Sequence, residues 1–253
     1  MPLEKIAETE DGDVAYYSPY AVDVGCMSDG GDFVRAPGGG DWLPSFLDAG
    51  RLSIFIAGNP GAGKSYLAKE IINTLPPIAD ILLFTSLEER DGNFEEFGDR
   101  VYKIRMEPEN LERLSLETIR KVSKFPILLF DDVDKIRDKK VETALFKLMN
   151  DALANGRGHK RHDGTGDIHV ICTSHALNDY VKTKYTLENS DYVALFPGST
   201  TKAQYERMCN KLGISRELCE LTYQGGKKNF YRYVIIKKTA PMYIMFGDTI
   251  TLI

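Results

Sequence analysis

The sequence predicts an α/β fold, in which a mainly parallel sheet is flanked by helices. Short runs of four to six apolar residues recur along the chain, and longer amphipathic stretches separate them. Uninterrupted apolar runs of this length are typical of strands buried on both faces, and their alternation with helices is typical of α/β proteins. The predicted strands are Leu52–Ala57, Ile81–Thr85, Ile127–Phe130, Ile168–Thr173 and Tyr192–Phe196, with a minor strand at Val101–Ile104. The predicted helices are 64–75, 109–123, 140–155 and 176–184.

The two ends of the chain depart from this pattern. Residues 1–41 are rich in Gly and Asp and show no sustained period, so we expect a flexible or irregular N-terminal arm before one α/β domain at 42–253. Beyond residue 197 we expect two short helices and then two late strands, antiparallel at one edge of the sheet. The helices are Thr200–Leu212 and Ser215–Thr222, and the strands are Asn229–Lys237 and Met242–Phe246.

Composition and charge exclude several classes of protein. The chain has 253 residues, of which 43% are hydrophobic and 27% charged, so it is neither wholly disordered nor a disulfide-rich miniprotein. It has no run of 18 apolar residues, so we expect no membrane span, and its acidic N-terminus predicts no secretory signal. The four cysteines are widely spaced, so we expect reduced thiols in an intracellular protein. A net charge of −5 excludes a polybasic nucleic-acid coat but allows a local basic surface.

The strongest motif is GNPGAGKS, which fits the phosphate-binding pattern G-x-x-x-x-G-K-[ST]. It follows a predicted strand and opens a predicted helix, which is the context that the pattern requires. The glycines let backbone N–H groups turn toward phosphate oxygens at the positive end of the helix. We expect Lys64 to place its charge on the β- and γ-phosphates and the Ser65 hydroxyl to bind Mg²⁺. The predicted nucleotide-binding residues are Gly58, Asn59, Pro60, Gly61, Ala62, Gly63, Lys64, Ser65 and Tyr66.

Paired carboxylates follow the apolar strand FPILLF. Asp131 occupies the Walker B position, where an aspartate holds Mg²⁺. Asp132 stands where many ATPases carry a glutamate that activates the attacking water, and Asp134 is a competing candidate for that role. Adjacent acids at a strand end are also common on protein surfaces, but the P-loop upstream favours the metal role for Asp131.

Spacing within the chain indicates the subtype of P-loop protein. A complete strand is predicted between the P-loop strand and the Asp131 strand, as in the many P-loop ATPases that insert an additional strand between their two Walker strands. A guanine-reading NKxD motif is not evident, because the nearest match, Asn210-Lys211-Leu212-Gly213, lacks the aspartate. We therefore predict ATP, with Mg²⁺, as the nucleotide.

Two further polar residues are candidates for the catalytic site. His175 follows the strand expected beside the Asp131 strand, where ligands collect in open α/β sheets, so we predict that it senses the γ-phosphate or the attacking water. The alternative is a structural neighbour of Ser174, which could cap the next helix. Arg157 follows the helix after Walker B, and an arginine at a subunit boundary can reach a neighbour's γ-phosphate. The predicted catalytic residues are Lys64, Asp132, His175 and Arg157.

Four segments also carry a resemblance to a known family. They are GNPGAGKS, ILLFDDVD, ANGRGH with the following IHVICTSHALNDY, and YVALFPGSTTKAQYERMCNKLGIS. From about residue 50 onward the chain resembles the FtsK–HerA-type genome-packaging ATPases of double-jelly-roll DNA viruses, in the branch of virophages and nucleocytoplasmic large DNA viruses. The resemblance implies a RecA/FtsK-like core and the residue roles given above. An extra stretch, KRHDGTG, leaves either Arg157 or Arg161 as the arginine finger.

The resemblance also implies a function and partners. It implies a homo-oligomer, with a ring as the expected form, that hydrolyses ATP to drive double-stranded DNA, independently of its sequence, into a preformed capsid at its vertex. The expected location is the host-cell cytoplasm or virus factory, or the virion itself. Two alternatives stay open: another ring ATPase, such as an AAA+ helicase or helicase loader, and a nucleotide-gated, capsid-associated binding module with little turnover.

Overall fold

The computed structural model describes residues 51–86, 94–157, 166–175, 180–229, 232–239, 242–247 and 249–253, and the backbone of four short strands before residue 45. The chain divides into two compact units, which are described separately. One is Gly50–Asp191, called the P-loop unit below, and the other joins Met1–Ala49 with Tyr192–Ile253 and is called the terminal unit. No helix in the described ranges is long and apolar enough to cross a bilayer.

The P-loop unit contains five parallel strands in the order β5-β9-β8-β6-β7. Their bounds are β5 (Ser53–Ala57), β6 (Asp80–Thr85), β7 (Val101–Lys103), β8 (Pro126–Asp131) and β9 (His169–Ser174). Strands β5, β6, β8 and β9 are buried almost throughout, which is why their sequences read as uninterrupted apolar runs. The predicted strands of this unit, the minor one included, are confirmed.

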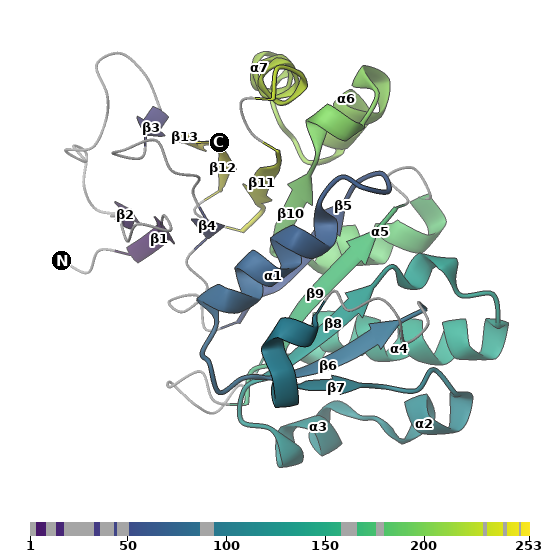
Figure 1. Cartoon of the computed structure of the whole chain (residues 1–253). Helices are drawn as coiled ribbons and strands as arrows, with labels where there is room; N and C mark the ends of the chain where they lie inside the picture. Colours follow the sequence, from purple (N-terminus) through teal and green to yellow (C-terminus); the bar gives the residue numbers. More distant parts are fainter. Residues whose placement is uncertain are drawn as a thin grey trace. The chain divides into compact units, whose positions relative to one another are not determined.

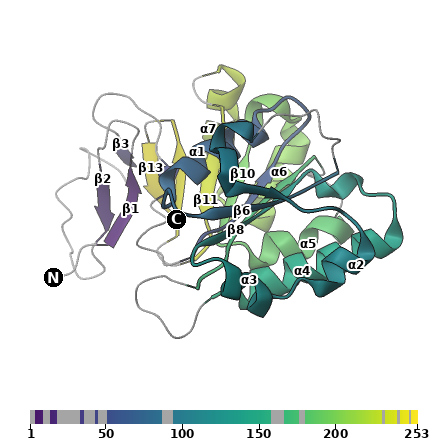
Figure 2. The ribbon, with the colours of Figure 1, turned by 60° about the horizontal axis from the view of Figure 1, so that its bottom comes forward.

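Helices cover both faces of this sheet (Figures 1 and 2). Helix α1 (Lys64–Thr74) lies on one face, and α4 (Lys139–Asn155) and α5 (Tyr180–Asn189) lie on the other. Helices α2 (Pro108–Arg113) and α3 (Leu116–Val122) pack against α4. The short 3₁₀ helices of the unit are η1 (Glu95–Arg100) and η2 (Val133–Lys135). This is the predicted α/β arrangement.

The prediction of a single helix over 109–123 was wrong. The chain forms two helices, because Ser115 leaves the helical conformation and caps α3 by accepting a hydrogen bond from the Thr118 N–H at 3.1 Å. Helix α5 also differs from its predicted bounds. It continues to Asn189, and residues 176–179 of the predicted helix lie outside the described residues.

A buried arginine fixes the end of α4 against the start of β9. Arg51 is 5% exposed, and its Nη2 donates to the carbonyls of Ala152 and Leu153, both at 2.9 Å. Its Nε donates to the Ile168 carbonyl at 3.3 Å. The Leu153 carbonyl is one that the end of a helix leaves without a partner, whereas the Ala152 carbonyl also accepts from the Gly156 N–H at 2.9 Å. Gly156 is required beside them, because a Cβ there would lie 2.4 Å from the Ala152 carbonyl oxygen.

The terminal unit contains an antiparallel succession of strands, β10-β11-β12-β13-β3. Their bounds are β10 (Tyr192–Leu195), β11 (Val234–Lys237), β12 (Tyr243–Phe246), β13 (Thr249–Leu252) and β3 (Phe33–Arg35). The antiparallel pairing of the two late strands is confirmed. Strand β13 was not predicted, because TITL offers only four residues and two of them are polar threonines.

Two helices and a 3₁₀ turn accompany these strands: η3 (Pro197–Ser199), α6 (Lys202–Lys211) and α7 (Arg216–Lys227). Helix α7 continues five residues past the predicted end at Thr222, through two glycines. Packing explains why a glycine is kept inside this helix. A Cβ on Gly226 would lie 2.3 Å from Cγ of Pro197, so only glycine allows α7 to contact η3 this closely.

The N-terminal region contains strands where we predicted no regular element. Strands β1 (Glu4–Glu8), β2 (Val14–Tyr17) and β4 (Leu43–Pro44) form a small antiparallel sheet in the order β2-β1-β4, and β3 pairs with β13. These strands have two to five residues, which is too short for a period of two to stand out in the sequence. The boundary at residue 41 stays a prediction.

His169 gives the P-loop unit a predictable response to acid. It is 4% exposed, and its Nδ1 accepts from the Leu52 N–H at 3.1 Å. Burial lowers the pKa of His169 from 6.5 to about 4. Between these pH values the unfolded chain binds a proton that the folded chain does not, so stability falls as the pH is lowered from 6.5 to 4. The contribution of His169 is at most about 3 kcal/mol.

We expect His169→Asn, which keeps an acceptor for Leu52 but does not titrate, to lose less stability than the parent on acidification. Urea unfolding at pH 7 and pH 4.5 measures this, and the difference between the two proteins should be about 2–3 kcal/mol. Equal pH dependence in the two proteins would show that His169 does not carry the effect.

Candidate active site

The phosphate-binding loop joins the carboxyl end of β5 to the start of α1. Its first residue is tied to the neighbouring strand β9, because the Gly58 N–H donates to the Ser174 carbonyl at 3.1 Å. Gly61 and Gly63 have φ values of +75° and +101°, which residues with a Cβ rarely adopt. The loop therefore has a tightly turned backbone that only glycine allows, directly before the N-terminus of a helix.

The side chain of Lys64 turns inward from this loop and is 5% exposed. Its ammonium donates to His175 Nδ1 at 2.9 Å and lies 3.8 Å from Asp132 Oδ1. A longer contact of 3.5 Å reaches the carbonyl of Asn59 in the loop itself. The structure thus brings together three of the four predicted catalytic residues, Lys64, Asp132 and His175.

His175 links the lysine to the carboxylate. Its Nε2 lies 2.6 Å from Asp132 Oδ2, and its Nδ1 contacts Lys64. Because an ammonium group has no lone pair to accept with, Nδ1 must accept from Lys64, and Nε2 is then the protonated nitrogen that faces Asp132. The imidazole of His175 therefore stands in contact with both Lys64 and Asp132.

Asp131 and Asp132 are held by Thr173, a residue that the sequence analysis did not select. Thr173 Oγ1 donates to Asp131 Oδ1 at 2.8 Å and accepts from the Asp132 N–H at 2.9 Å. All three residues are buried. Burial raises the pKa of the Asp131 carboxyl above its usual value, and the hydrogen bond from Thr173 acts in the opposite direction. Thr173 therefore favours the ionised form of Asp131 and fixes the backbone of Asp132.

Asp132 has a backbone conformation that is uncommon outside glycine, with φ 49° and ψ 36°. Aspartate tolerates this left-handed region better than most residues, and residues held there cluster at functional sites. The Asp132 Oδ2 atom lies 3.7 Å from Lys135 Nζ, and its carbonyl accepts from Ser86 Oγ at 3.2 Å. Asp132, rather than Asp131, is thus the carboxylate around which the cationic side chains gather.

Ser65 and Asp131 could hold a divalent cation. Ser65 is partly exposed in the first turn of α1, and Asp131 is buried at the end of β8. Both supply oxygen ligands, which Mg²⁺ prefers. Burial raises the pKa of Asp131, and a cation bound beside it would favour the ionised carboxylate. The residues present therefore fit Mg²⁺. Tyr66, also predicted at this site, is 52% exposed.

Arg157 lies near the amino end of β9, whereas this cluster lies at the carboxyl ends of the strands. It directly follows Gly156, whose carbonyl accepts from the Ile168 N–H just before β9 begins. Its side chain is 60% exposed, and Nη2 lies 3.5 Å from Asp191 Oδ1. The 17 residues of α4, about 25 Å of helix, lead from the Walker B side of the sheet to Arg157. Within one chain, Arg157 is not brought to Lys64. Arg161 and the side chain of Asp134 lie outside the described residues.

A comparison with protein families decides the general class. The model for the ATPase family associated with various cellular activities (AAA) matches residues 54–186, more than half of the chain. The chain belongs to this family. It is an ATPase with the fold of a P-loop NTPase, and the matched residues include the P-loop, Asp131, Asp132, Thr173 and His175. The additional-strand arrangement is also confirmed, because β9 lies between β5 and β8. The inserted strand is β9 and not the Ile81–Thr85 strand, which lies on the other side of β8 as β6.

Relatives of this AAA ATPase include a virophage protein. Uncharacterized protein V3 of Sputnik virophage is 27% identical over 200 residues, which are 77% of this chain and 74% of that protein. This relative bears out the resemblance to virophage proteins. Among solved structures, the genome packaging NTPase B204 of Sulfolobus turreted icosahedral virus 2, in complex with AMPPCP, is 15% identical with a TM-score of 0.46, covering 78% of this chain and 97% of that chain.

A further solved structure, the pCW3 conjugation coupling protein TcpA with ATPgS, is also 15% identical with a TM-score of 0.46. It covers 91% of this chain and 67% of that chain. Because these TM-scores are below 0.5, we draw no conclusion about function from either structure.

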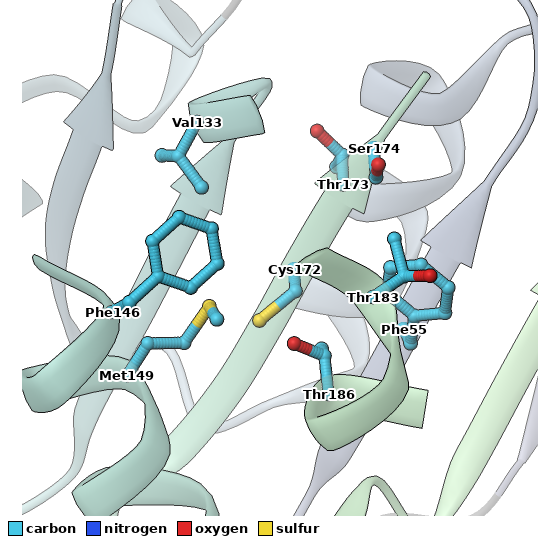
Figure 3. Close-up of a pocket in the computed structure, with 9 residues that line it drawn as sticks. All are labelled: Phe55, Val133, Phe146, Met149, Cys172, Thr173, Ser174, Thr183 and Thr186. Atoms are coloured by element: carbon cyan, nitrogen blue, oxygen red, sulfur yellow. The ribbon is translucent and has the colours of Figure 1, made fainter. Parts of the chain in front are cut away.

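A small pocket lies behind the active site of the AAA ATPase, on the face of the sheet covered by α4 and α5 (Figure 3). Phe146 and Met149 of α4 line one side and Thr186 of α5 the other, with Cys172 of β9 between them. None of the described side chains that line it is charged. Burial raises the pKa of the Cys172 thiol far above its usual value, which makes this cysteine an inert part of the core.

We expect Thr173→Val to slow ATP hydrolysis by about 10- to 100-fold, the usual cost of losing a residue that orients a metal-binding side chain. The substitution keeps the shape of Thr173 but leaves Asp131 without its hydrogen bond and the buried Asp132 N–H without an acceptor. Steady-state phosphate release measures the effect. Thr173→Ser, which retains the hydroxyl, should stay close to the parental rate. Equal losses in the two variants would assign the effect to packing instead.

Proposed function

We propose that this AAA ATPase is a motor that uses ATP hydrolysis to move double-stranded viral DNA into a preformed capsid. The observation that carries the proposal is the similarity to the Sputnik virophage protein. Its 200 aligned residues exceed the span of the family match at 54–186, so the similarity includes sequence outside the nucleotide-binding core. The segment YVALFPGSTTKAQYERMCNKLGIS, which resembles packaging ATPases, also lies beyond that core.

The proposed reaction assigns the clustered side chains to separate tasks. Backbone N–H groups of the P-loop bind the phosphates, and the Lys64 ammonium moves from His175 and Asp132 to the β- and γ-phosphate oxygens. Asp132 then accepts a hydrogen bond from the attacking water and orients it toward the γ-phosphorus. His175, freed from Lys64 at Nδ1, stays in contact with Asp132 and so reports whether a γ-phosphate is in place.

The metal belongs to the same proposal. Bound by the Ser65 hydroxyl and the Asp131 carboxylate, Mg²⁺ would neutralise charge on the β- and γ-phosphates. Thr173 orients Asp131 for this role. The separation of Asp131 and Asp132 into a metal ligand and a water-orienting base agrees with their surroundings, because the cationic side chains contact Asp132.

A homo-oligomeric ring completes the proposal. Within one chain, Arg157 lies at the amino ends of the strands and Lys64 at their carboxyl ends, so an arginine finger at Arg157 requires a second subunit. In a ring, each Arg157 would reach the phosphate-binding loop of its neighbour, and sequential hydrolysis around the ring would move DNA along the axis. Contacts to DNA are expected to involve phosphates rather than base edges, because packaging must accept any sequence.

ATP hydrolysis in the presence of DNA tests the proposal. We expect long duplex DNA of mixed sequence to raise the hydrolysis rate several-fold, in a manner that weakens steeply with salt. Short single strands should have less effect. An unchanged rate with duplex DNA at low salt, in protein that hydrolyses ATP, would overturn the assignment as a DNA motor.

A helicase or helicase loader is the second candidate, because the family match at 54–186 covers only the nucleotide-binding core. The same assay separates the two functions when one strand of the duplex carries a fluorophore. A packaging motor hydrolyses ATP on duplex DNA without separating the strands, whereas a helicase releases the labelled strand. Absence of turnover under all these conditions would favour a nucleotide-gated binding module.

A further inference from the structure

The carboxylate of Asp132 has cationic or hydrogen-bonding side chains near both of its oxygens. Oδ1 lies 3.3 Å from Thr173 Oγ1 and 3.8 Å from Lys64 Nζ. Oδ2 lies 2.6 Å from His175 Nε2 and 3.7 Å from Lys135 Nζ. Two lysine ammonium groups and the His175 imidazole thus face this carboxylate, and the Thr173 hydroxyl lies beside it but gives its one proton to Asp131. A positive charge beside the carboxylate competes with the attacking water for its oxygens, so the withdrawal of one ammonium group favours the water.

These four side chains differ in how accessible they are from outside the protein. Thr173 is 2% exposed, Lys64 is 5% exposed and the His175 side chain is 16% exposed. The Lys135 side chain is 49% exposed, because it projects from the short helix η2. Lys64 can be drawn away by ATP itself. Lys135 is the donor that a macromolecule at the surface can reach.

Lys135 also begins the most cationic stretch beside the active site. Arg137, Lys139 and Lys140 follow it and are exposed, and none of the three has an ion-pair partner among the described residues. The carboxylate of Asp138 within this stretch is engaged at the N-terminus of α4, where it accepts from the Lys140 and Val141 N–H groups. Other surface lysines are neutralised, as in the pairs Lys69–Glu96 and Lys121–Glu117.

We propose that Lys135 couples the binding of duplex DNA to ATP hydrolysis. DNA phosphates held by the exposed cations at 135–140 compete with Asp132 for the Lys135 ammonium. When Lys135 turns to a phosphate, Oδ2 of Asp132 loses a positively charged competitor for the attacking water. The high charge density of duplex DNA favours this exchange over a single carboxylate. The inference rests on the proposed function, because it takes DNA as the partner.

Hydrolysis rates with and without long duplex DNA test the proposal in four proteins: the parent, Lys135→Met, Lys135→Arg and Lys147→Met. Lys147 is an exposed lysine farther along α4 and serves as the matched control. We expect the rate of Lys135→Met without DNA to rise toward the DNA-stimulated rate of the parent, so that its ratio of stimulated to basal rate is near one. Lys135→Arg and Lys147→Met should keep the parental ratio.

A double variant, Lys139→Gln/Lys140→Gln, provides a second readout through DNA affinity. We expect the slope of log affinity against log salt to fall by about two, since each lost phosphate contact removes about 0.9. The coupling role of Lys135 is overturned if Lys135→Met keeps the parental ratio, or if its basal rate falls by the same factor with and without DNA. If the parent itself does not respond to DNA, the proposed function fails. In that case, if Lys135→Met hydrolyses ATP without DNA no faster than the parent does, the proposal that Lys135 restrains Asp132 is also rejected.

Discussion

Lys64→Ala is expected to reduce ATP hydrolysis by at least about 100- to 1,000-fold, the cost of removing one donor that stabilises transition-state charge. Lys64 supplies the cationic side chain of the phosphate-binding loop, and it is only 5% exposed to water. Shielding strengthens its attraction for phosphate oxygens. We also expect weaker nucleotide binding, because Lys64 contacts phosphates in the ground state as well as in the transition state.

Lys69→Ala is the matched control for this substitution. Lys69 lies in the same helix α1, but it pairs with Glu96 at 3.1 Å on the surface. Steady-state phosphate release and titration with a fluorescent ATP analogue measure hydrolysis and binding separately, and thermal unfolding verifies that both variants are folded. Parental hydrolysis by Lys64→Ala would exclude the P-loop as the site of the reaction, whatever the family of the chain.

The strands of the P-loop unit could be predicted from sequence because burial on both faces leaves a direct signal. LSIFIA and ILLF are too short and too uniformly apolar for amphipathic helices, and they alternate with stretches of helical period. The strands before residue 45 give no such signal. They are short and their sequences mix polar and apolar residues, so their pairing depends on partners such as β13 that lie far away in sequence.

Within the candidate site, residues that carry a motif could be predicted and residues that support it could not. Lys64 and Asp131 are fixed by patterns of neighbouring residues. The sequence led us to expect β9 beside β8, but the role of Thr173 depends on the register that places its side chain beside Asp131 and Asp132, which the sequence does not give. A hydroxyl residue just before the predicted sensor in IHVICTSH was the available signal. Arg51 left none, since an arginine before a strand usually lies in solvent.

Arg157→Ala is expected to lower ATP hydrolysis strongly while leaving the fold almost as stable as before. Arginine fingers in GTPases contribute about three to five orders of magnitude in rate. In a ring ATPase we expect a loss of at least about 10-fold. The stability effect should be small, because the Arg157 side chain is 60% exposed and exposed ion pairs contribute at most about 1 kcal/mol. Arg113→Ala, at an exposed position in α2, is the control.

Mixing two inactive variants decides whether Arg157 acts on its own subunit or on a neighbour. Arg157→Ala subunits retain Lys64, and Lys64→Ala subunits retain Arg157. If the arginine acts on the neighbouring site, some interfaces in a mixed ring pair an intact loop with an intact arginine, and partial hydrolysis returns. A mixture that stays inactive, from subunits shown to co-assemble, would mean that each Arg157 serves its own site. That outcome would require one chain to bring Arg157 to its own Lys64. The structure places these residues at opposite ends of the strands, with the 17 residues of α4 between the Walker B side and Arg157. A fully active Arg157→Ala variant would remove Arg157 as the finger and make Arg161 the next residue to test.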